Sequence, residues 1–369
     1  MSRRRVAIVG AGIVGLAHAL AAVRRGDEVT VFERDAQAQG ASVRNFGLGL
    51  LLGQPQGEMW DLAWRSRELW LGLLPQLGVW HKAQGSLTVA RDLAQWRVLE
   101  AFQALQGGHY QTTLLNGEQV AARQLHGLGA LHSPHEIGLE SRVVLPALAK
   151  WLAEAQGVRF VFDTLVREIS LPHVRTSRGT FEADEVIVCA GHDFQTLYPE
   201  AFAPLGVRRC ALQMLRAVAP GLSMAPAVLT GLSTLHYPSF TQEPRLAAVL
   251  SDLQAHVRQT QPLVMAHGIH LIIQQVGEGG ELIIGDSHQY GTSPSAFEQE
   301  AVSAFLMQEA EAVLWRKLVV RERWQGIYAS GPRPYEALQV AEGVRCVTIT
   351  AGVGMSIALG LAERLMATT

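Results

Sequence analysis

A glycine-rich turn near the start of the chain limits the possible folds more than any other feature. An apolar run leads into Gly10-Ala11-Gly12-Ile13-Val14-Gly15, and a second apolar run ends at Glu33. The first glycine permits a tight turn, the second lets the backbone approach a pyrophosphate, and the third lets a helix pack closely on its strand. The pyrophosphate then lies at the helix N-terminus, and Glu33 can accept the ribose hydroxyls. The pattern predicts a Rossmann-like strand–helix–strand unit that binds ADP-ribose.

The same stretch has a second interpretation. Arg3-Arg4-Arg5 and the apolar run up to Val23 are also typical of a secretory leader. The glycines at turn spacing argue against a leader, and so does Glu33, because its strand would lose its partner if residues before it were removed. We therefore favour the nucleotide-binding unit.

Length, charge and cysteine content narrow the class of protein. The chain has 369 residues, which is long for one core, and 31 basic against 33 acidic residues, so we expect two lobes and neither a nucleic-acid nor a membrane partner. No apolar stretch beyond the N-terminus is long enough to span a bilayer. The 3 cysteines, Cys189, Cys210 and Cys346, are far apart and form no Cys-x-x-Cys motif. They predict neither disulfides nor a zinc ribbon, and they fit a cytoplasmic location.

The order of patterns predicts an α/β chain, α+β as a whole, with a Rossmann-like lobe in three pieces. A continuous apolar run over 185–191 is typical of a buried parallel strand. Short alternating runs over 207–291 predict an antiparallel sheet with a hairpin at Glu278-Gly279-Gly280. We expect a nucleotide-binding domain from residues 1–80, 140–206 and 320–369, and a substrate-binding domain from residues 81–139 and 207–319.

Several segments in a fixed order carry a family resemblance. They are the glycine turn with Glu33, the loop 40–47, the strand end Ala190-Gly191, the stretch 324–328 with the later Arg333-Pro334, and Gly352-Val353-Gly354. Through them nearly the whole chain resembles the FAD-dependent amine oxidoreductases that include D-amino acid oxidase, glycine oxidase and sarcosine oxidase. Segments 209–215, 236–240 and 285–290 resemble a subgroup linked to the breakdown of 2-aminoethylphosphonate and its relatives.

The resemblance implies FAD and a set of residues around it. Gly352-Val353-Gly354, between a strand and a helix, would face the flavin edge where negative charge gathers on reduction; an ordinary strand-to-helix turn is the alternative. Arg44 can also be a solvated loop cation, and Val166 a core valine. Besides the glycine turn and Glu33, the resemblance places along the cofactor Arg34, Ser42, Arg44, Asn45, Phe46, Val166, Ala190, Gly191, Tyr328, Gly352, Val353, Gly354, Met355 and Ser356.

Two departures from the family pattern qualify this picture. Monomeric sarcosine oxidases attach FAD through a cysteine after the motif glycine, but residues 326–330 contain none, so we expect non-covalent FAD. Ser356 stands where those enzymes place a lysine that helps to hold the substrate carboxylate. The site that binds the substrate's acid group must therefore differ from theirs.

The chemistry implied by the resemblance is hydride transfer from a neutral amine to flavin N5, followed by hydrolysis of the imine. The protein then needs a group that holds the acidic end of the substrate. Arg333 is the first candidate, because a guanidinium can bind an acid group with two hydrogen bonds; a surface salt bridge is the alternative. We expect the other candidates to lie on antiparallel strands that cover the flavin: His236, Tyr237, His270, His288 and Tyr290. A single histidine is more often a structural residue, so the prediction of an acid-binding site depends on the group as a whole.

A metal site is not predicted. The segment 132–136 has suitable ligand atoms, but Pro134 prevents their presentation on a helix, and the chain contains no His-Glu-x-x-His motif.

The leading hypothesis is an FAD-dependent amine oxidoreductase that cleaves the C–N bond of a small anionic amine. The subgroup resemblance implies 2-aminoethylphosphonate or its N-methyl derivative as substrate, with phosphonoacetaldehyde as product and O2 or another compound as electron acceptor. The alternatives are a glycine, sarcosine or D-amino acid oxidase, a tRNA-modifying enzyme, which the balanced charge disfavours, and a non-catalytic FAD-binding module. No oligomeric state is predicted.

Overall fold

The computed structural model describes residues 3–224 and 226–367. Residues 1–2, 225 and 368–369, which the predicted domains include, lie outside this description. The helices are α1 (Ile13–Arg25), α2 (Glu58–Leu77), α3 (Leu93–Tyr110), α4 (Gly117–Ala121), α5 (Ser141–Gln156), α6 (Pro199–Phe202), α7 (Pro238–Thr241), α8 (Ala247–Thr260), α9 (Pro262–His267), α10 (Glu300–Leu314) and α11 (Gly354–Ala367). The 3-10 helices are η1 (Ala41–Val43), η2 (Ala203–Leu205), η3 (Gly231–Leu235) and η4 (Pro244–Leu246).

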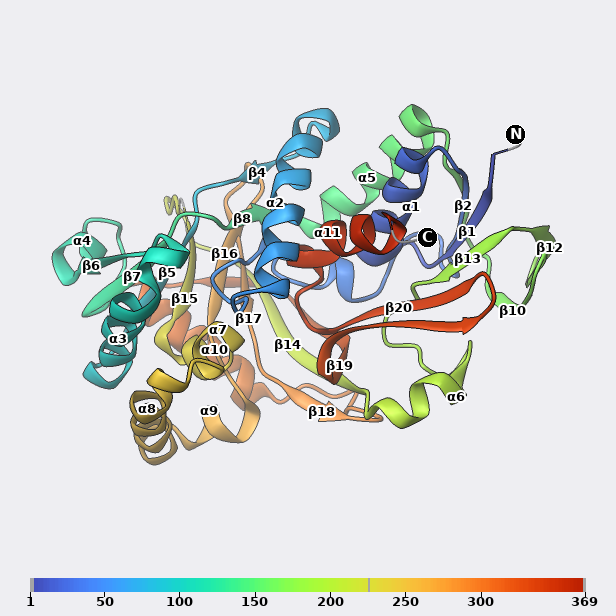
Figure 1. Cartoon of the computed structure of the whole chain (residues 1–369). Coiled ribbons are helices and arrows are strands. Elements are labelled where there is room, and N and C mark those ends of the chain that lie inside the picture. The colour runs from blue at the N-terminus through green and yellow to red at the C-terminus, as the bar shows by residue number, and fades with distance from the viewer. Residues whose placement is uncertain (1–2, 225, 368–369) are drawn as a thin grey trace.

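One large sheet of 14 strands runs through the molecule (Figure 1). Its strands are β1 (Arg5–Val9), β2 (Glu28–Phe32), β5 (Ser86–Ala90), β6 (Thr113–Asn116), β7 (Gly129–Ser133), β9 (Arg159–Val161), β13 (Glu185–Val188), β14 (Arg208–Val218), β15 (Ala227–Thr230), β16 (Ile272–Val276), β17 (Glu281–Gly285), β18 (Gln289–Gly291), β19 (Val319–Ala341) and β20 (Val344–Ala351). Two small sheets contain β3 (Leu48–Gly49), β4 (His81–Lys82) and β8 (Ile137–Leu139), and β10 (Val166–Ser170), β11 (His173–Thr176) and β12 (Gly179–Glu182).

The strand directions divide the large sheet into two parts. At one end β20, β13, β1, β2 and β9 are parallel neighbours, as in a nucleotide-binding fold. Beyond them β19, β14, β17, β16 and β15 pair antiparallel. The predicted combination of a Rossmann-like part and an antiparallel part is confirmed. The pair β14 and β19 joins both parts in one continuous sheet, and the proposed domain boundaries remain a prediction.

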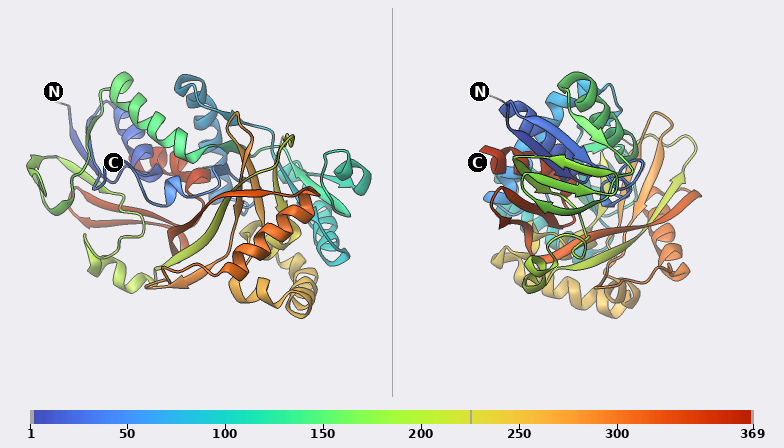
Figure 2. Two further views of the ribbon diagram at one scale, coloured as in Figure 1. Left: turned by 180° about the vertical axis from the view of Figure 1, so that it is seen from behind. Right: turned by 90° about the vertical axis from the view of Figure 1, so that its right-hand side faces the viewer.

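The N-terminal strand–helix–strand unit forms as predicted. Gly10 adopts φ +102°, and a Cβ there would lie 2.5 Å from the Cys189 carbonyl oxygen, so only glycine fits this turn. Helix α1 ends at Gly26, which has the left-handed conformation common after helices. Helix α11 lies against α1 and α2, which brings the C-terminal part of the chain beside the N-terminal unit (Figures 1 and 2).

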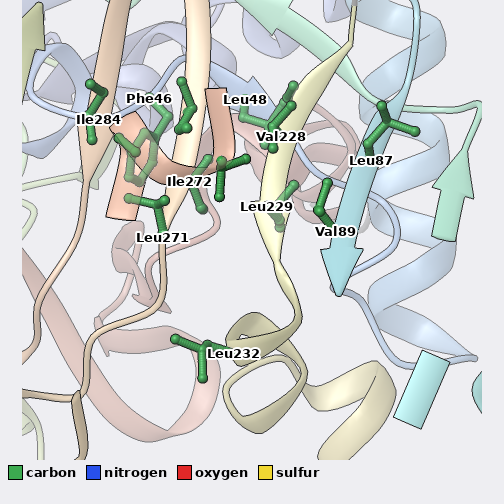
Figure 3. Close-up of a cluster of buried hydrophobic side chains, with 14 of the residues drawn as sticks. Phe46, Leu48, Leu87, Val89, Val228, Leu229, Leu232, Leu271, Ile272 and Ile284 are labelled. Atoms are coloured by element: carbon green, nitrogen blue, oxygen red, sulfur yellow. The ribbon is translucent and has the colours of Figure 1, made fainter. Parts of the chain in front are cut away.

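A second core lies under the antiparallel part. Phe46 and Leu48, which follow η1, belong to the same buried cluster as residues of β5, β15 and β16 (Figure 3). Helices α8, α9 and α10 lie at the end of the molecule away from both termini (Figures 1 and 2). The segment after η1 therefore connects the nucleotide-binding part with the antiparallel part.

The structure corrects the placement of the histidine-containing segments. Residues 231–246 form η3, α7 and η4 rather than a strand, and Pro238 begins α7 because the first helical position needs no N–H donor. His270 precedes β16, and His288 lies in the connection between β17 and β18. Only Tyr290 of the five candidates lies on a strand. The prediction that all of them lie on antiparallel strands is wrong for the other four.

None of the described helices combines the length and the apolar character that crossing a membrane requires.

Candidate functional site

A cavity of about 460 Å³ lies between the parallel and antiparallel parts of the molecule. One end is formed by the β1–α1 turn and the residues after β2. The middle is formed by η1, β19 and the N-terminus of α11. The other end is formed by segments of the antiparallel part, and its polar wall consists of His236, Tyr237, His270, Asp286 and His288.

The glycine turn is shaped by close backbone contacts. A Cβ on Gly15 would lie 1.9 Å from the Gly10 carbonyl oxygen, so Gly15 holds α1 against β1 without lining the cavity. A Cβ on Gly12 would meet only the Ser42 hydroxyl, at 3.0 Å, and this glycine lines the cavity. The Ser42 hydroxyl accepts a hydrogen bond from the Ile13 N–H at 2.9 Å. Ser42 thus ties the predicted cofactor loop to the first turn of α1.

Glu33 has a structural role in addition to its predicted one. Its side chain is 8% exposed, lines the cavity, and accepts hydrogen bonds from the N–H groups of Ala11 at 2.8 Å and Asp35 at 3.2 Å. A carboxylate has about four acceptor sites, so it can brace the glycine turn and still accept ribose hydroxyls. Ala11 itself does not line the cavity.

The wall beside Glu33 contains a network that sequence analysis missed. Asp193 accepts hydrogen bonds from Arg34 and from the Thr196 hydroxyl. Burial would raise the pKa of Asp193, but these hydrogen bonds outweigh it and lower the pKa to about 2. His192, Asp193 and Thr196 all line the cavity. Their position just after Ala190-Gly191 was the available signal, because residues that follow a parallel strand face the nucleotide-binding edge.

The middle of the cavity is built from segments far apart in sequence. Asn45 donates to the carbonyl oxygens of Ala41 and Ser42, and its own oxygen accepts from Gly47 N–H, so it shapes the loop around η1. The Arg44 carbonyl accepts a hydrogen bond from the Trp324 indole at 3.1 Å. These bonds hold the 41–47 loop on β19.

Tyr328 and the N-terminus of α11 form the opposite side of this middle region. A Cβ on Gly352 would lie 3.2 Å from the Tyr328 ring, and one on Gly354 would lie 3.3 Å from the Ile13 side chain. The α11 terminus therefore lies beside the start of α1. The Ser356 hydroxyl accepts from Leu50 N–H at 2.9 Å, so this residue has a structural partner in the backbone.

Four aromatic side chains converge at the end of the cavity away from the glycine turns. The His236 ring lies 4.2 Å from the His270 ring and 4.5 Å from the His288 ring, measured between centroids. The Tyr237 ring contacts His236 and His270, and it packs on Gly53. We refer to His236, His270 and His288 as the histidine cluster. Their closest ligating nitrogen atoms all lie within 4.8 Å of one another.

The cavity brings together most of the residues predicted for the cofactor. Those that line it are Gly10, Gly12, Ile13, Val14, Glu33, Arg34, Ser42, Arg44, Asn45, Phe46, Val166, Ala190, Gly191, Tyr328, Gly352, Val353, Gly354, Met355 and Ser356. Among the substrate candidates, His236, Tyr237, His270 and His288 line it.

Arg333 and Tyr290 lie outside the cavity. Arg333 is ion-paired with Glu336, with 61% of its side chain exposed while Glu336 is 1% exposed. This is the surface-salt-bridge alternative weighed from the sequence. Tyr290 is 42% exposed and lies under the Arg208 guanidinium at 4.4 Å.

The position of Arg333 leads to a first prediction. We expect Arg333→Gln to leave the KM for an amine substrate within about twofold of the parent value, since Arg333 does not line the cavity and its exposed guanidinium is paired with Glu336. Steady-state kinetics of both proteins tests this. A KM increase of about 100-fold without loss of thermal stability would instead favour Arg333 as the group that holds the substrate's acid.

Comparison with known proteins now identifies the cofactor. The family model described as FAD dependent oxidoreductase (DAO) matches residues 5–368. The chain belongs to this family. Its cofactor is therefore FAD, and the prediction of an FAD-dependent oxidoreductase is confirmed.

Solved structures support the fold. Glycine oxidase from Bacillus cereus has a TM-score of 0.78 at 18% identity, covering 99% of this chain and 94% of that chain. L-proline dehydrogenase from P. horikoshii has a TM-score of 0.75 at 17% identity, covering 99% and 92%. Among curated proteins, the tRNA 5-methylaminomethyl-2-thiouridine biosynthesis bifunctional protein MnmC of Chromohalobacter salexigens is 26% identical over 254 residues. That match covers 62% of this chain and 34% of the relative, so the chain spans much less than the relative's length.

The residues present fit FAD. The cavity extends from the glycine turn and Glu33, which suit the ADP half, past the 41–47 loop to the α11 terminus, which suits the flavin half. Gly12 leaves a cradle that a Cβ would narrow against Ser42. The histidine cluster lines the remaining end of the same cavity.

Proposed function

We propose that the protein catalyses the FAD-dependent oxidation of the C–N bond of a small amine that also carries an acid group, a donor of the CH–NH or CH–NH2 type. The observation that carries this proposal is the single cavity that joins the two glycine turns to the histidine cluster. Bound FAD would accept a hydride from the carbon next to the nitrogen. Hydrolysis of the resulting imine would complete the cleavage.

The walls between the two ends support this chemistry. Phe46, Leu48, Leu50, Leu212 and Ile272 line the cavity and are buried, so they can exclude water from the amine. Exclusion of water favours the neutral amine, which is the form that can lose a hydride. The polar groups at the histidine end can then hold the acid group and fix the orientation of the substrate.

Two substrate classes have separate support. The likeness in fold to glycine oxidase supports small amino acids such as glycine, sarcosine or D-amino acids. The three imidazoles at the end of the cavity, together with the subgroup resemblance, support 2-aminoethylphosphonate or its N-methyl derivative, because a phosphonate has more acceptor oxygens than a carboxylate. We place the amino acids first and the aminophosphonates second.

The MnmC relative supports another candidate, a step of tRNA modification. The charge balance of 31 basic and 33 acidic residues offers little attraction for a polyanion. Binding of transfer RNA that weakens steeply with salt would favour this candidate.

An anaerobic reduction screen tests the proposed function. The oxidised holoenzyme is mixed with glycine, sarcosine, D-alanine, 2-aminoethylphosphonate and N-methyl-2-aminoethylphosphonate, and the flavin band at about 450 nm is followed. We expect at least one amine to bleach the band at a saturable rate, and the ranking of kcat/KM values assigns the substrate class. A band that no member bleaches would favour a non-catalytic FAD-binding module.

The cysteines support a second prediction, that FAD is not covalently attached. Cys189 lines the cavity, but burial raises the pKa of its thiol, which disfavours the reactive thiolate. We expect acid precipitation to release all of the flavin into the supernatant, measured by its fluorescence. Flavin that stays with the denatured polypeptide would contradict this.

All three cysteines are free and buried, which supports our proposal of a reducing compartment such as the cytoplasm.

A further inference from the structure

The substrate end of the cavity differs in charge from a site built around arginine. Among the described residues, the cavity wall contains the guanidinium groups of Arg34 and Arg44 and no lysine. Arg34 is paired with Asp193, and Arg44 donates to the Gln325 carbonyl at 3.4 Å. Both guanidinium groups therefore have partners outside the histidine cluster.

The hydrogen bonds of the cluster leave several ring nitrogens without a protein partner. His288 Nδ1 lies 2.9 Å from the Gly268 carbonyl, which can only accept, so Nδ1 carries the proton and Nε2 is left over. His270 Nδ1 lies 3.3 Å from the Ser233 hydroxyl, while its Nε2 has no hydrogen-bond partner among the described residues. Asp286 Oδ1, 3.5 Å from that nitrogen, also has none. Unpaired buried polar atoms of this kind indicate that a ligand binds here, because nearly all such atoms are hydrogen-bonded in native proteins.

Burial keeps the cluster uncharged at neutral pH. It lowers the pKa of His236 to about 4 and that of His288 to about 3, and it places the pKa of His270 well below its usual value. Burial also shifts the titratable groups around the cluster toward their neutral forms. These groups are Tyr237, which directly precedes α7, Asp286 from the β17–β18 connection, Tyr290 from β18, Cys210 from β14 and Tyr328 from β19. The Arg208 guanidinium lies 4.4 Å from the centroid of the Tyr290 ring.

We propose that the histidine cluster is a receptor that binds the substrate's acid group as an oxyanion together with one proton from solvent. This inference rests on the proposed function and deepens it. An oxyanion near an imidazole favours the charged form of that ring, so a ring that is neutral alone becomes an imidazolium beside the anion. The proton adds to a free ring nitrogen, and the resulting N–H donates to the acid group. No covalent bond in the anion changes.

His236 is the best placed to take this proton. Its ring lies 4.2 Å and 4.5 Å from the other two, which are 5.1 Å apart, and no hydrogen bond joins its side chain to another described residue. Asp286 can orient His270 in the same event, since its unpartnered oxygen faces His270 Nε2. At 3.5 Å the two groups are close enough to share a proton after a small movement of either side chain.

A metal ion fits the cluster less well than an anion. Zinc–nitrogen bonds of about 2.0–2.1 Å hold the nitrogens of a tetrahedral site within about 3.4 Å of one another. The nitrogens here spread over distances up to 4.8 Å, which leaves room for an acid group that accepts from them.

The sign of the pH dependence follows from the direction of the pKa changes. The imidazole that takes up the proton has a low pKa in the free protein and a raised pKa in the anion complex. At pH values between these two pKa values, only the complex holds the extra proton. Binding in this window takes up one proton, and each unit of rising pH should weaken the affinity about tenfold. A receptor with permanently charged groups would show no such slope.

The test uses the oxidised holoenzyme and two anions, sulfate and acetate, whose own charge is constant between roughly pH 6 and 8. Kd values are measured from the perturbation of the flavin spectrum. Proton uptake is measured by calorimetry in two buffers of different ionisation enthalpy. We expect about one proton per bound anion at pH 7 and a Kd that rises about tenfold per pH unit. Tighter binding of sulfate would indicate a tetrahedral acid group, and tighter binding of acetate a carboxylate.

Variants connect this behaviour to the cluster. His236→Gln keeps a hydrogen-bond donor but cannot take up a proton, so it should weaken anion binding at least tenfold at pH 6 and flatten the slope. His132→Gln is the control, because burial also lowers the pKa of His132 but this residue does not line the cavity. It should bind anions like the parent protein.

Three results would overturn the proposal. The first is a Kd independent of pH without proton uptake, the second is unchanged anion binding in His236→Gln, and the third is binding that needs added Zn²⁺ and disappears with a chelator. Anion binding with proton uptake but no flavin reduction by any amine would refute the proposed function alone. Amine oxidation without proton-coupled anion binding would refute the receptor alone.

Discussion

Replacing Gly15 by alanine is expected to lower the free energy of unfolding by about 2–4 kcal/mol and to abolish retention of FAD during purification. The added Cβ would lie 1.9 Å from the Gly10 carbonyl oxygen, which is backbone and cannot rotate away. Helix α1 would have to move off β1, and the N–H groups at its start would no longer meet the pyrophosphate. Thermal unfolding and the ratio of flavin to protein absorbance measure both effects.

Gly72 offers a matched control, because it also lies within a helix, α2, but has open space where an added Cβ would lie. Gly72→Ala should keep its FAD and gain up to about 1 kcal/mol, the ordinary difference in helix propensity. If Gly15→Ala and Gly72→Ala have the same thermal stability and the same FAD content, the contact between α1 and β1 does not maintain the cofactor site.

Replacing Glu136 by alanine is expected to lower the free energy of unfolding by about 3 kcal/mol or more. Glu136 is 0% exposed and has no ion-pair partner among the described residues. Its carboxylate accepts hydrogen bonds from the N–H groups of Leu51 and Leu52 and from the hydroxyls of Ser86 and Ser133. Alanine would leave four buried donors unpaired. Urea unfolding followed by circular dichroism measures the loss.

The Glu136→Gln variant should retain most of the stability that the Glu136→Ala variant loses. Its single amide oxygen takes the place of Oε1, which now accepts three hydrogen bonds, and its NH2 group can donate to the Ser86 hydroxyl. We expect a loss of about 1 kcal/mol. Because the same segment continues to Gly53, which packs under Tyr237, the alanine variant should also raise the KM for the substrate. Equal losses in both variants would show that the negative charge itself is needed.

The parts of the site that depend on local backbone geometry were predictable from the sequence. The turn from β1 to α1 needs glycine at Gly10, Gly12 and Gly15 for reasons that act within a few residues, and Glu33 follows β2 at a set distance. The glycines before α11 carry the same kind of local signal. These residues lie along one cavity as expected, with Ala11 and Gly15 supporting it from behind.

The group that holds the substrate's acid was not predictable in the same way. Arg333 had the right chemistry, but β19 turns it toward Glu336 and solvent. The prediction grouped His236, His270 and His288, which the structure brings together, but it assigned them to strands. The short runs of the predicted sheet did not reveal that Pro238 starts a helix. The ring distances depend on how three connections pack together.

The sequence alone determined the position of the nucleotide-binding turn, because glycines that permit close backbone approach act over short range. The order of its segments determined the class of the fold, and through the family resemblance it also implied FAD. Only the tertiary structure decided which polar side chains meet at the other end of the cavity. His236, His270 and His288 come from three separate segments. Their burial, their missing partners and their low charge arise from packing between segments, which no local pattern encodes.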